Sequence, residues 1–89
     1  MRIKENYVLK SIVGTWSVFP IGDAVLNLNG ILTLNDTGCI LWHMLEGGST
    51  KEDLTSRLVS EYDVSYDEAY ADVCAFINKL TEVGCIDDN

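Results

Sequence analysis

The sequence predicts an α+β domain in which a three-stranded antiparallel sheet is followed by three helices. Two observations carry this prediction. Residues 7–34 contain three short runs rich in β-branched and aromatic side chains. From residue 36 onward, apolar residues recur at three- and four-residue steps in three segments, each preceded by a residue that can cap a helix. The first two helical segments are joined by Gly47-Gly48-Ser49, a spacing compatible with a helix-turn-helix. The compact arrangement of these elements is winged-helix-like.

The length and composition of the chain favour a single globular domain that spans residues 1–89. The chain has 89 residues, 47% of them hydrophobic, with one proline, which is typical of a globular domain with a single core. No apolar run approaches the roughly 20 residues that span a bilayer, and the N-terminus lacks the apolar core of a signal peptide. The cysteines, Cys39, Cys74 and Cys85, are odd in number and lack metal-site spacing, which argues against a disulfide framework and against a zinc site. We expect a cytoplasmic protein without a cofactor.

The first two strands are expected at residues 7–12 and 15–19. Val13-Gly14 between them suits the tight turn of a hairpin. Pro20 cannot donate a backbone hydrogen bond to the sheet and should end the second strand. The conformation of residues 21–29 stays open.

The third strand is expected at residues 31–34, where it feeds directly into the first helix. Asn35 or Asp36 can cap that helix, which should cover about residues 36–46. Gly38, Leu41, Trp42 and Leu45 share one helix face, so we expect Trp42 to be largely buried. Glycine inside a helix costs about 1 kcal/mol relative to alanine, so Gly38 indicates a close backbone contact.

The second and third helices also have recognisable starts. Ser49 or Thr50 should cap the second helix, which fades by Tyr62-Asp63. Ser65 with Glu68 resembles a capping box and should start a third helix that runs to about Val83. The principal apolar stripe of that helix is expected to be Ala69, Val73, Phe76, Leu80 and Val83.

The charge balance bears on the class of partner. Fourteen acidic and six basic residues give a net charge of −8. Nucleic-acid binding draws most of its affinity from Lys and Arg on phosphates, so we predict no specific duplex binding at physiological salt. The acidic surface suits basic partners or serves solubility alone.

No catalytic constellation is evident. His43 is the one histidine, and its place between core positions of a helix favours a structural or surface role over that of a general base. Cys39 and Cys74 have the character of packed core residues. Acidic residues at the helix starts complement the helix dipole. We therefore predict that the protein is not an enzyme.

Two features instead indicate binding. A three-stranded sheet has two edges, and an edge strand can pair with an extended peptide. On the third helix, Tyr66, Tyr70, Cys74 and Ile77 continue the apolar stripe around one flank, so the apolar arc is wider than one packed face needs. Either the helix is wedged between the sheet and its neighbouring helices, or this flank lines a groove beside the edge strand.

The chain resembles the PqqD-like family, also called RiPP recognition elements, whose members serve the biosynthesis of ribosomally made, modified peptides. The residues that carry the resemblance are Gly30 to Gly38, Leu41-Trp42 with Leu45, Glu46-Gly47-Gly48, Glu61 to Val64, and the long helix ending at Val83-Gly84. The match covers about two thirds of the chain.

This resemblance implies a winged-helix-like, non-catalytic domain that captures the leader segment of a precursor peptide. It implies presentation of that peptide to a modifying enzyme, often a radical SAM maturase. The leader would be held as an added strand along the third strand, against the third helix. The peptide-binding residues would then be Ile31, Leu32, Thr33 and Leu34 on the strand and Tyr70, Val73, Cys74 and Ile77 on the helix.

Two other functions are compatible with the element order. A winged-helix DNA-binding regulator is one, although the second helix offers only Lys51 and Arg57 among acidic residues. A structural subunit that docks on a larger enzyme is the other, and it is compatible with peptide capture. Whether the chain dimerises stays open.

Overall fold

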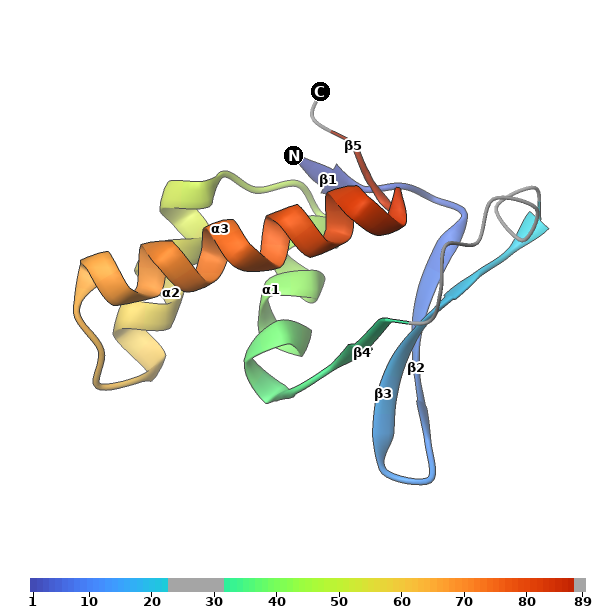
Figure 1. Ribbon diagram of the computed structural model, residues 1–89, viewed down its shortest axis with the longest axis horizontal. Helices are drawn as coiled ribbons and strands as arrows, with labels where there is room; N and C mark the ends of the chain where they lie inside the picture. The colour runs from blue at the N-terminus through green and yellow to red at the C-terminus, as the bar shows by residue number, and fades with distance from the viewer. Residues whose placement is uncertain (23–31, 88–89) are drawn as a thin grey trace.

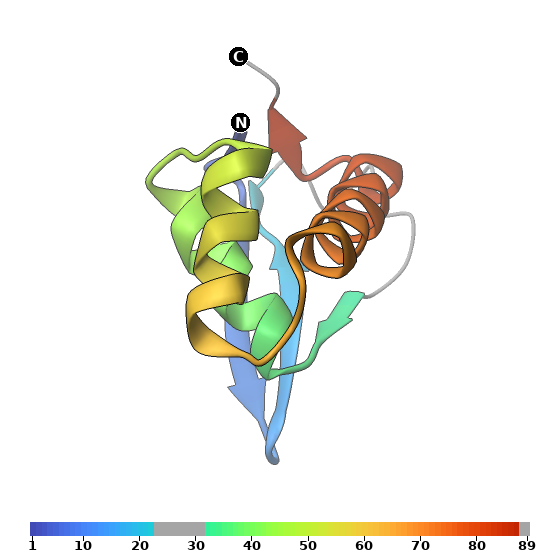
Figure 2. The same cartoon turned by 90° about the vertical axis from the view of Figure 1, so that its left-hand side faces the viewer.

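The computed structural model describes residues 1–22 and 32–87, and it confirms the expected α+β architecture (Figure 1). Strands β2 (Tyr7–Ile12), β3 (Thr15–Pro20) and β4 (Leu32–Leu34) form an antiparallel sheet in the order β2-β3-β4. Helices α1 (Asp36–Glu46), α2 (Lys51–Glu61) and α3 (Tyr66–Val83) follow. The hairpin of β2 and β3 extends away from the helices (Figures 1 and 2), and Figure 1 shows β4 between the hairpin and α1. Nearly all of the stretch left open at residues 21–29 lies outside the described residues.

Local side-chain chemistry starts each helix. The Asn35 side chain accepts a hydrogen bond from the backbone N–H of Gly38 at 2.8 Å, which makes Asn35 the cap of α1. Thr50 Oγ1 accepts from the N–H of Asp53 at the start of α2. Ser65 Oγ accepts from the N–H of Glu68 at the start of α3. These caps place the helix boundaries where the sequence predicts them.

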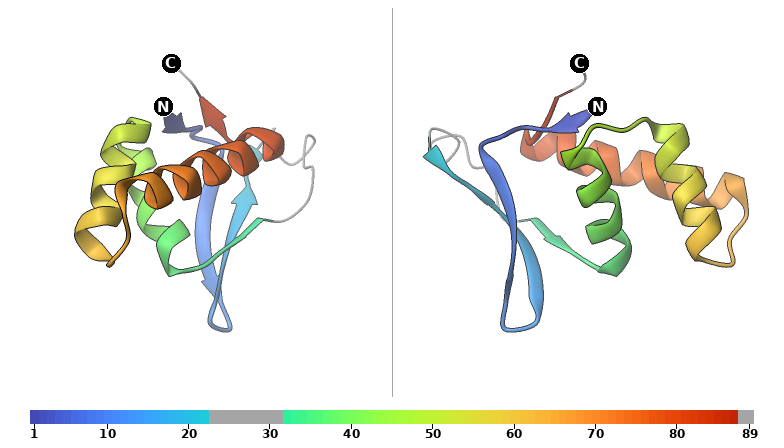
Figure 3. Two further views of the ribbon diagram at one scale, coloured as in Figure 1. Left: turned by 60° about the vertical axis from the view of Figure 1, so that its left-hand side comes forward. Right: turned by 180° about the vertical axis from the view of Figure 1, so that it is seen from behind.

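The two ends of the described chain are joined by a pairing that the sequence analysis did not predict. Strand β1 (Arg2–Ile3) pairs antiparallel with β5 (Ile86–Asp87), so that Ile3 lies opposite Ile86. Beside this pair, Met1 and Ser49 exchange hydrogen bonds of 2.8 and 3.0 Å through their backbone groups. Both views of Figure 3 show β1 beside β5. The first residues thus tie the α1–α2 connection to the end of α3.

The core lies where α1, α2 and α3 meet beside the sheet. Trp42 has no exposed surface, as its place in the helical pattern predicts. The buried apolar residues around it are Leu41, Leu45, Leu54, Leu58, Ala69, Val73, Ile77, Leu80 and Cys85. Burial raises the pKa of the Cys85 thiol to about 11, so this cysteine behaves as a packed apolar side chain.

The buried stripe of α3 differs from the expected one at three positions. Ile77, 5% exposed, belongs to the core, whereas Phe76 and Val83 are only partly buried. The reason is that the buried face is formed by Ala69, Val73, Ile77 and Leu80, so it lies slightly to one side of the expected stripe and leaves Phe76 at its margin. Phe76 is thereby placed toward β4.

Candidate functional site: the groove between β4 and α3

Strand β4 is an edge of its sheet, because β3 is its one partner among the described strands. The direction of its backbone groups follows from the neighbouring pair. Ile21 donates its N–H to the Asn6 carbonyl at 2.9 Å, so odd-numbered residues of β3 bond toward β2. Even-numbered residues of β3 therefore bond toward β4, and Trp16 and Val18 lie opposite Leu34 and Leu32.

It follows that Leu32 and Leu34 direct their N–H and C=O groups toward β3. Thr33, between them, directs its N–H and C=O away from β3, toward the open edge. A strand laid along this edge would find one donor and one acceptor at Thr33.

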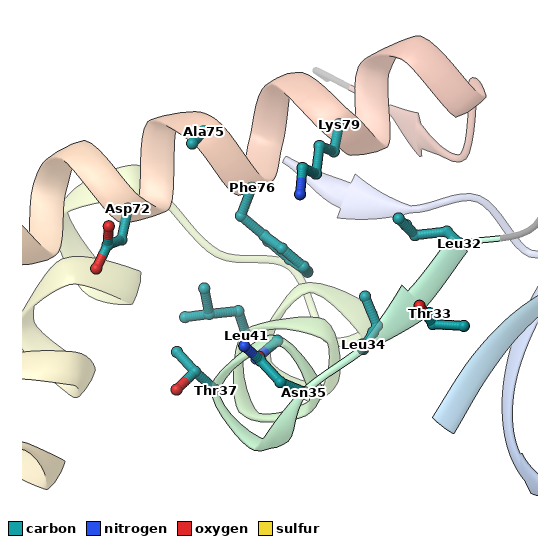
Figure 4. A pocket seen from close by; sticks show the side chains of 11 residues that line it. Leu32, Thr33, Leu34, Asn35, Thr37, Leu41, Asp72, Ala75, Phe76 and Lys79 are labelled. Carbon is teal, nitrogen blue, oxygen red and sulfur yellow. The ribbon is translucent and has the colours of Figure 1, made fainter. Parts of the chain in front are cut away.

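A groove of about 370 Å³ lies between this edge and α3 (Figure 4). The strand side of the groove is formed by Leu32, Thr33 and Leu34. From α3, Phe76 projects into the space between the two elements, and Leu41 of α1 lies below it (Figure 4). The remaining lining residues are Asn35, Thr37, Gly38, Asp72, Ala75 and Lys79. The groove thus has an apolar interior beside an unpaired strand edge.

Gly38 forms part of the groove where α1, β4 and α3 come closest. A Cβ atom at this position would lie 3.2 Å from Leu34 Cβ and 3.3 Å from Phe76 Cε1, closer than ordinary van der Waals contact. The close backbone contact predicted for Gly38 is therefore confirmed. The missing side chain leaves room for the ring of Phe76 against α1.

On the strand side, the structure brings together the residues that the sequence analysis assigned. Leu32, Thr33 and Leu34 all line the groove. Ile31 lies outside the described residues. Whether these positions bind a peptide stays a prediction.

On the helix side, the structure places the four assigned residues elsewhere. Val73 and Ile77 are buried in the core, at 0% and 5% exposure, and cannot contact a ligand without opening the core. Tyr70 and Cys74 lie on the opposite flank of α3, toward α2. The Cys74 thiol beside Tyr70 raises the pKa of the phenol, and Glu52 of α2 contributes to the same rise. None of the four residues lines the groove.

The helix residues that do line the groove were missed for an identifiable reason. Asp72, Ala75 and Lys79 are polar or small, so a search for the widest apolar arc selects the other flank. On that other flank Tyr66 and Tyr70 stack, with ring centroids 6.3 Å apart. The signal that could have found the groove is the pair of opposite charges flanking Phe76.

The rest of the described chain shows no second cluster with evident chemistry. His43 is exposed and lies 2.8 Å from Glu46 on the same helix, as a surface pair. Within residues 1–22 and 32–87, no group of three or more His, Cys, Asp or Glu side chains could hold a metal ion. No helix among these residues is both long and apolar enough to cross a membrane.

Comparisons with known proteins give one matching family model and two solved structures of similar fold. The family model described as coenzyme PQQ synthesis protein D (PqqD) matches residues 23–86. A structure of lasso peptide synthetase B1 complexed with the leader peptide superposes with a TM-score of 0.74 at 24% identity, covering 94% of this chain and 93% of that chain. A structure of TbiB1 in complex with the TbiA(beta) leader peptide superposes with a TM-score of 0.72 at 22% identity. The superposition covers 98% of this chain and 100% of that chain. Among curated proteins, no sequence matches this chain.

Proposed function

This chain belongs to the PqqD family, and we propose that it is a non-catalytic module that binds the leader segment of a ribosomally made precursor peptide. The leader adds as a strand along β4, and its side chains contact α3. The module then presents the peptide to a modifying enzyme such as a radical SAM maturase. The encounter takes place in the cytoplasm, where ribosomal precursors are made.

One observation carries this proposal: the backbone of Thr33 turns its N–H and C=O toward an apolar groove instead of toward a neighbouring strand. Unpaired backbone groups at a sheet edge provide affinity for an extended peptide regardless of its side chains. The adjoining apolar space then selects among side chains. Both structural neighbours are complexes with leader peptides, and their fold likeness supports the same use of the groove here.

On the helix side, the residues that we assign to the groove differ from those expected from the sequence. On the strand side they are the expected ones. We assign the strand contacts to Leu32, Thr33 and Leu34. On α3 we assign contacts to Phe76 and its charged neighbours Asp72 and Lys79, because these side chains line the groove.

The DNA-binding alternative is not favoured. Arg57, one of two basic residues on α2, is paired with Glu61 at 3.0 Å. The net charge of −8 further disfavours contact with phosphates.

A proline exchange at Thr33 tests the proposal. Thr33→Pro removes the N–H that faces the open edge but leaves the bonds between β3 and β4 in place, and proline is tolerated at such edge positions. We expect the variant to fold and to lose about 1–3 kcal/mol of leader binding, the cost of an unmade hydrogen bond. The measurement is titration calorimetry with the cognate leader peptide, alongside circular dichroism.

Two matched variants complete the test. Thr33→Ala keeps the N–H and should bind within about 0.5 kcal/mol of wild type, as expected of a surface substitution. Leu32→Pro removes an N–H that faces β3, so it should lower folding stability. A folded Thr33→Pro variant that binds the leader as wild type does would refute strand addition at β4. Ile77→Asp is unsuited to this test, because Ile77 is buried and the variant would disrupt the core.

A further inference from the structure

Two opposite charges bracket the apolar part of the groove. Asp72 and Lys79 both line it, both are exposed, and Phe76 lies between them on α3. In Figure 4, Asp72 lies at the end of the groove where Thr37 and Leu41 lie, whereas the Lys79 side chain extends into the space between Phe76 and Leu32 at the other end. The two ends of the groove therefore carry charges of opposite sign.

Neither charge is in an ion pair within the described residues. They cannot neutralise each other, because they stand seven positions apart on the helix, about 10 Å along its axis. Lys79 is also the one basic residue of α3, on a chain whose net charge is −8. Lys79 is therefore available to form an ion pair with an acidic side chain of a ligand bound in the groove.

We propose that the groove selects its peptide by charge order: a basic residue at the Asp72 end, a bulky apolar residue over Phe76, and an acidic residue at the Lys79 end. This inference rests on the proposed function and specifies its ligand. Charge complementarity across an interface fixes register and orientation more than it adds affinity. The backbone contacts of the groove do not depend on the sequence of the peptide. Its selectivity therefore comes from side-chain contacts such as these charge pairs.

The direction of the peptide follows from the strand it joins. Antiparallel pairing is slightly more stable per residue, and it lets both groups of Thr33 bond to a single peptide residue. Strand β4 runs from the Lys79 end toward the Asp72 end (Figure 4). An antiparallel peptide therefore has its basic residue on the N-terminal side of the apolar residue and its acidic residue on the C-terminal side.

The spacing of the two charges is set by helix and strand geometry. About 10 Å along α3 corresponds to about three residues of an extended strand at 3.3–3.4 Å each. Side chains on one face of a strand recur every second residue. Because the apolar residue between them must lie on the same face, the charged residues of the peptide should stand about four positions apart.

Selection from a random phage-displayed peptide library tests this inference on the whole chain. The baits are wild type, the exchanged variant Asp72→Lys/Lys79→Asp, and a control, Arg57→Glu/Glu61→Arg. Both double variants keep the net charge, and the control exchanges an exposed ion pair on α2, away from the groove. The enriched peptides are then synthesised in both charge orders and titrated by fluorescence anisotropy at low and high salt.

We expect wild type and control to enrich the basic–apolar–acidic order and the exchanged variant to enrich the reverse. Each exposed charge pair contributes a few-fold, so the preferred order should bind about three- to tenfold more tightly at low salt. The preference should shrink at high salt. Peptides that bind wild type and the exchanged variant without charge order would overturn this inference and leave strand addition standing. A wild-type selection that enriches no peptide would contradict the proposed function itself.

Discussion

At the scale of single residues, Trp42 combines full burial with an unmet hydrogen bond. Its side chain has no exposed surface, and its indole N–H has no partner among the described residues. A buried donor without a partner costs about 1–3 kcal/mol. The residue therefore stabilises the core through its volume and contacts while its polar atom opposes burial.

Two substitutions at Trp42 should lower the free energy of unfolding by different amounts. Trp42→Ala removes the whole ring and should cost about 3–5 kcal/mol, enough to threaten folding in a domain of this size. Trp42→Phe leaves a smaller cavity and also removes the unpaired N–H, so the net loss should stay near 1 kcal/mol. Urea unfolding followed by circular dichroism measures both. A loss well above about 2 kcal/mol in Trp42→Phe would mean that the indole N–H is hydrogen-bonded, because the substitution would then also remove a made hydrogen bond.

At the scale of elements, the strain in the β2–β3 hairpin is concentrated in its turn. Val13 has a φ of +52° and Gly14 a φ of +78°, the combination of a type I′ turn. Glycine and asparagine adopt this conformation readily, whereas a β-branched residue in it is an outlier. Val13 is 98% exposed, so no packing compensates for its strain.

Replacing Val13 should therefore stabilise the protein. Val13→Asn suits the first position of a type I′ turn, and we expect a gain of about 1 kcal/mol, or about 4–8 °C in melting temperature. Val13→Thr is the matched control, because it is polar but still β-branched and should bring no such gain. Thermal unfolding monitored by circular dichroism compares them. A similar rise in both variants would assign the effect to surface polarity instead of backbone strain.

Elements whose signals are local could be predicted from the sequence, and those set by distant contacts could not. Asn35, Thr50 and Ser65 start their helices through hydrogen bonds that span three residues, so the helix boundaries follow from the chain itself. Strands β1 and β5 have two residues each and are stabilised by pairing across the whole length of the chain, which leaves no periodicity to detect.

The candidate site shows the same division. The edge strand was predictable because it is a short β-type run between turn residues. The groove-facing flank of α3 was not, because an apolar arc reveals which side of a helix is buried but not which neighbour covers each margin. Here the margin with the exposed Tyr70 lies on the side of Glu52 of α2, and β4 faces the margin with Asp72 and Lys79.

At the scale of the whole molecule, the pairing of β1 with β5 links parts that are remote in sequence. Lys4 donates its N–H to the Cys85 carbonyl at 3.0 Å, and Met1 is bonded to Ser49 in the α1–α2 connection. Ile3 is 7% exposed and belongs to the same core cluster as Trp42. We propose on this basis that residues 1–89 fold as one cooperative domain.

Truncating Ile3 tests that cooperativity. Ile3→Ala should cost about 2–4 kcal/mol, because it removes a buried side chain from the point where the first strand, the last strand and α1 meet. Ile12→Ala makes the same truncation at a position that is 55% exposed, so it should change stability by less than about 0.5 kcal/mol.

Urea unfolding is followed by far-ultraviolet circular dichroism for the helices and by tryptophan fluorescence for Trp16 and Trp42. In one cooperative domain the two transitions coincide in wild type and shift together in Ile3→Ala. If the fluorescence and dichroism transitions separate in the variant, the sheet and the helices unfold independently, and β1 with β5 is only a local attachment of the chain ends.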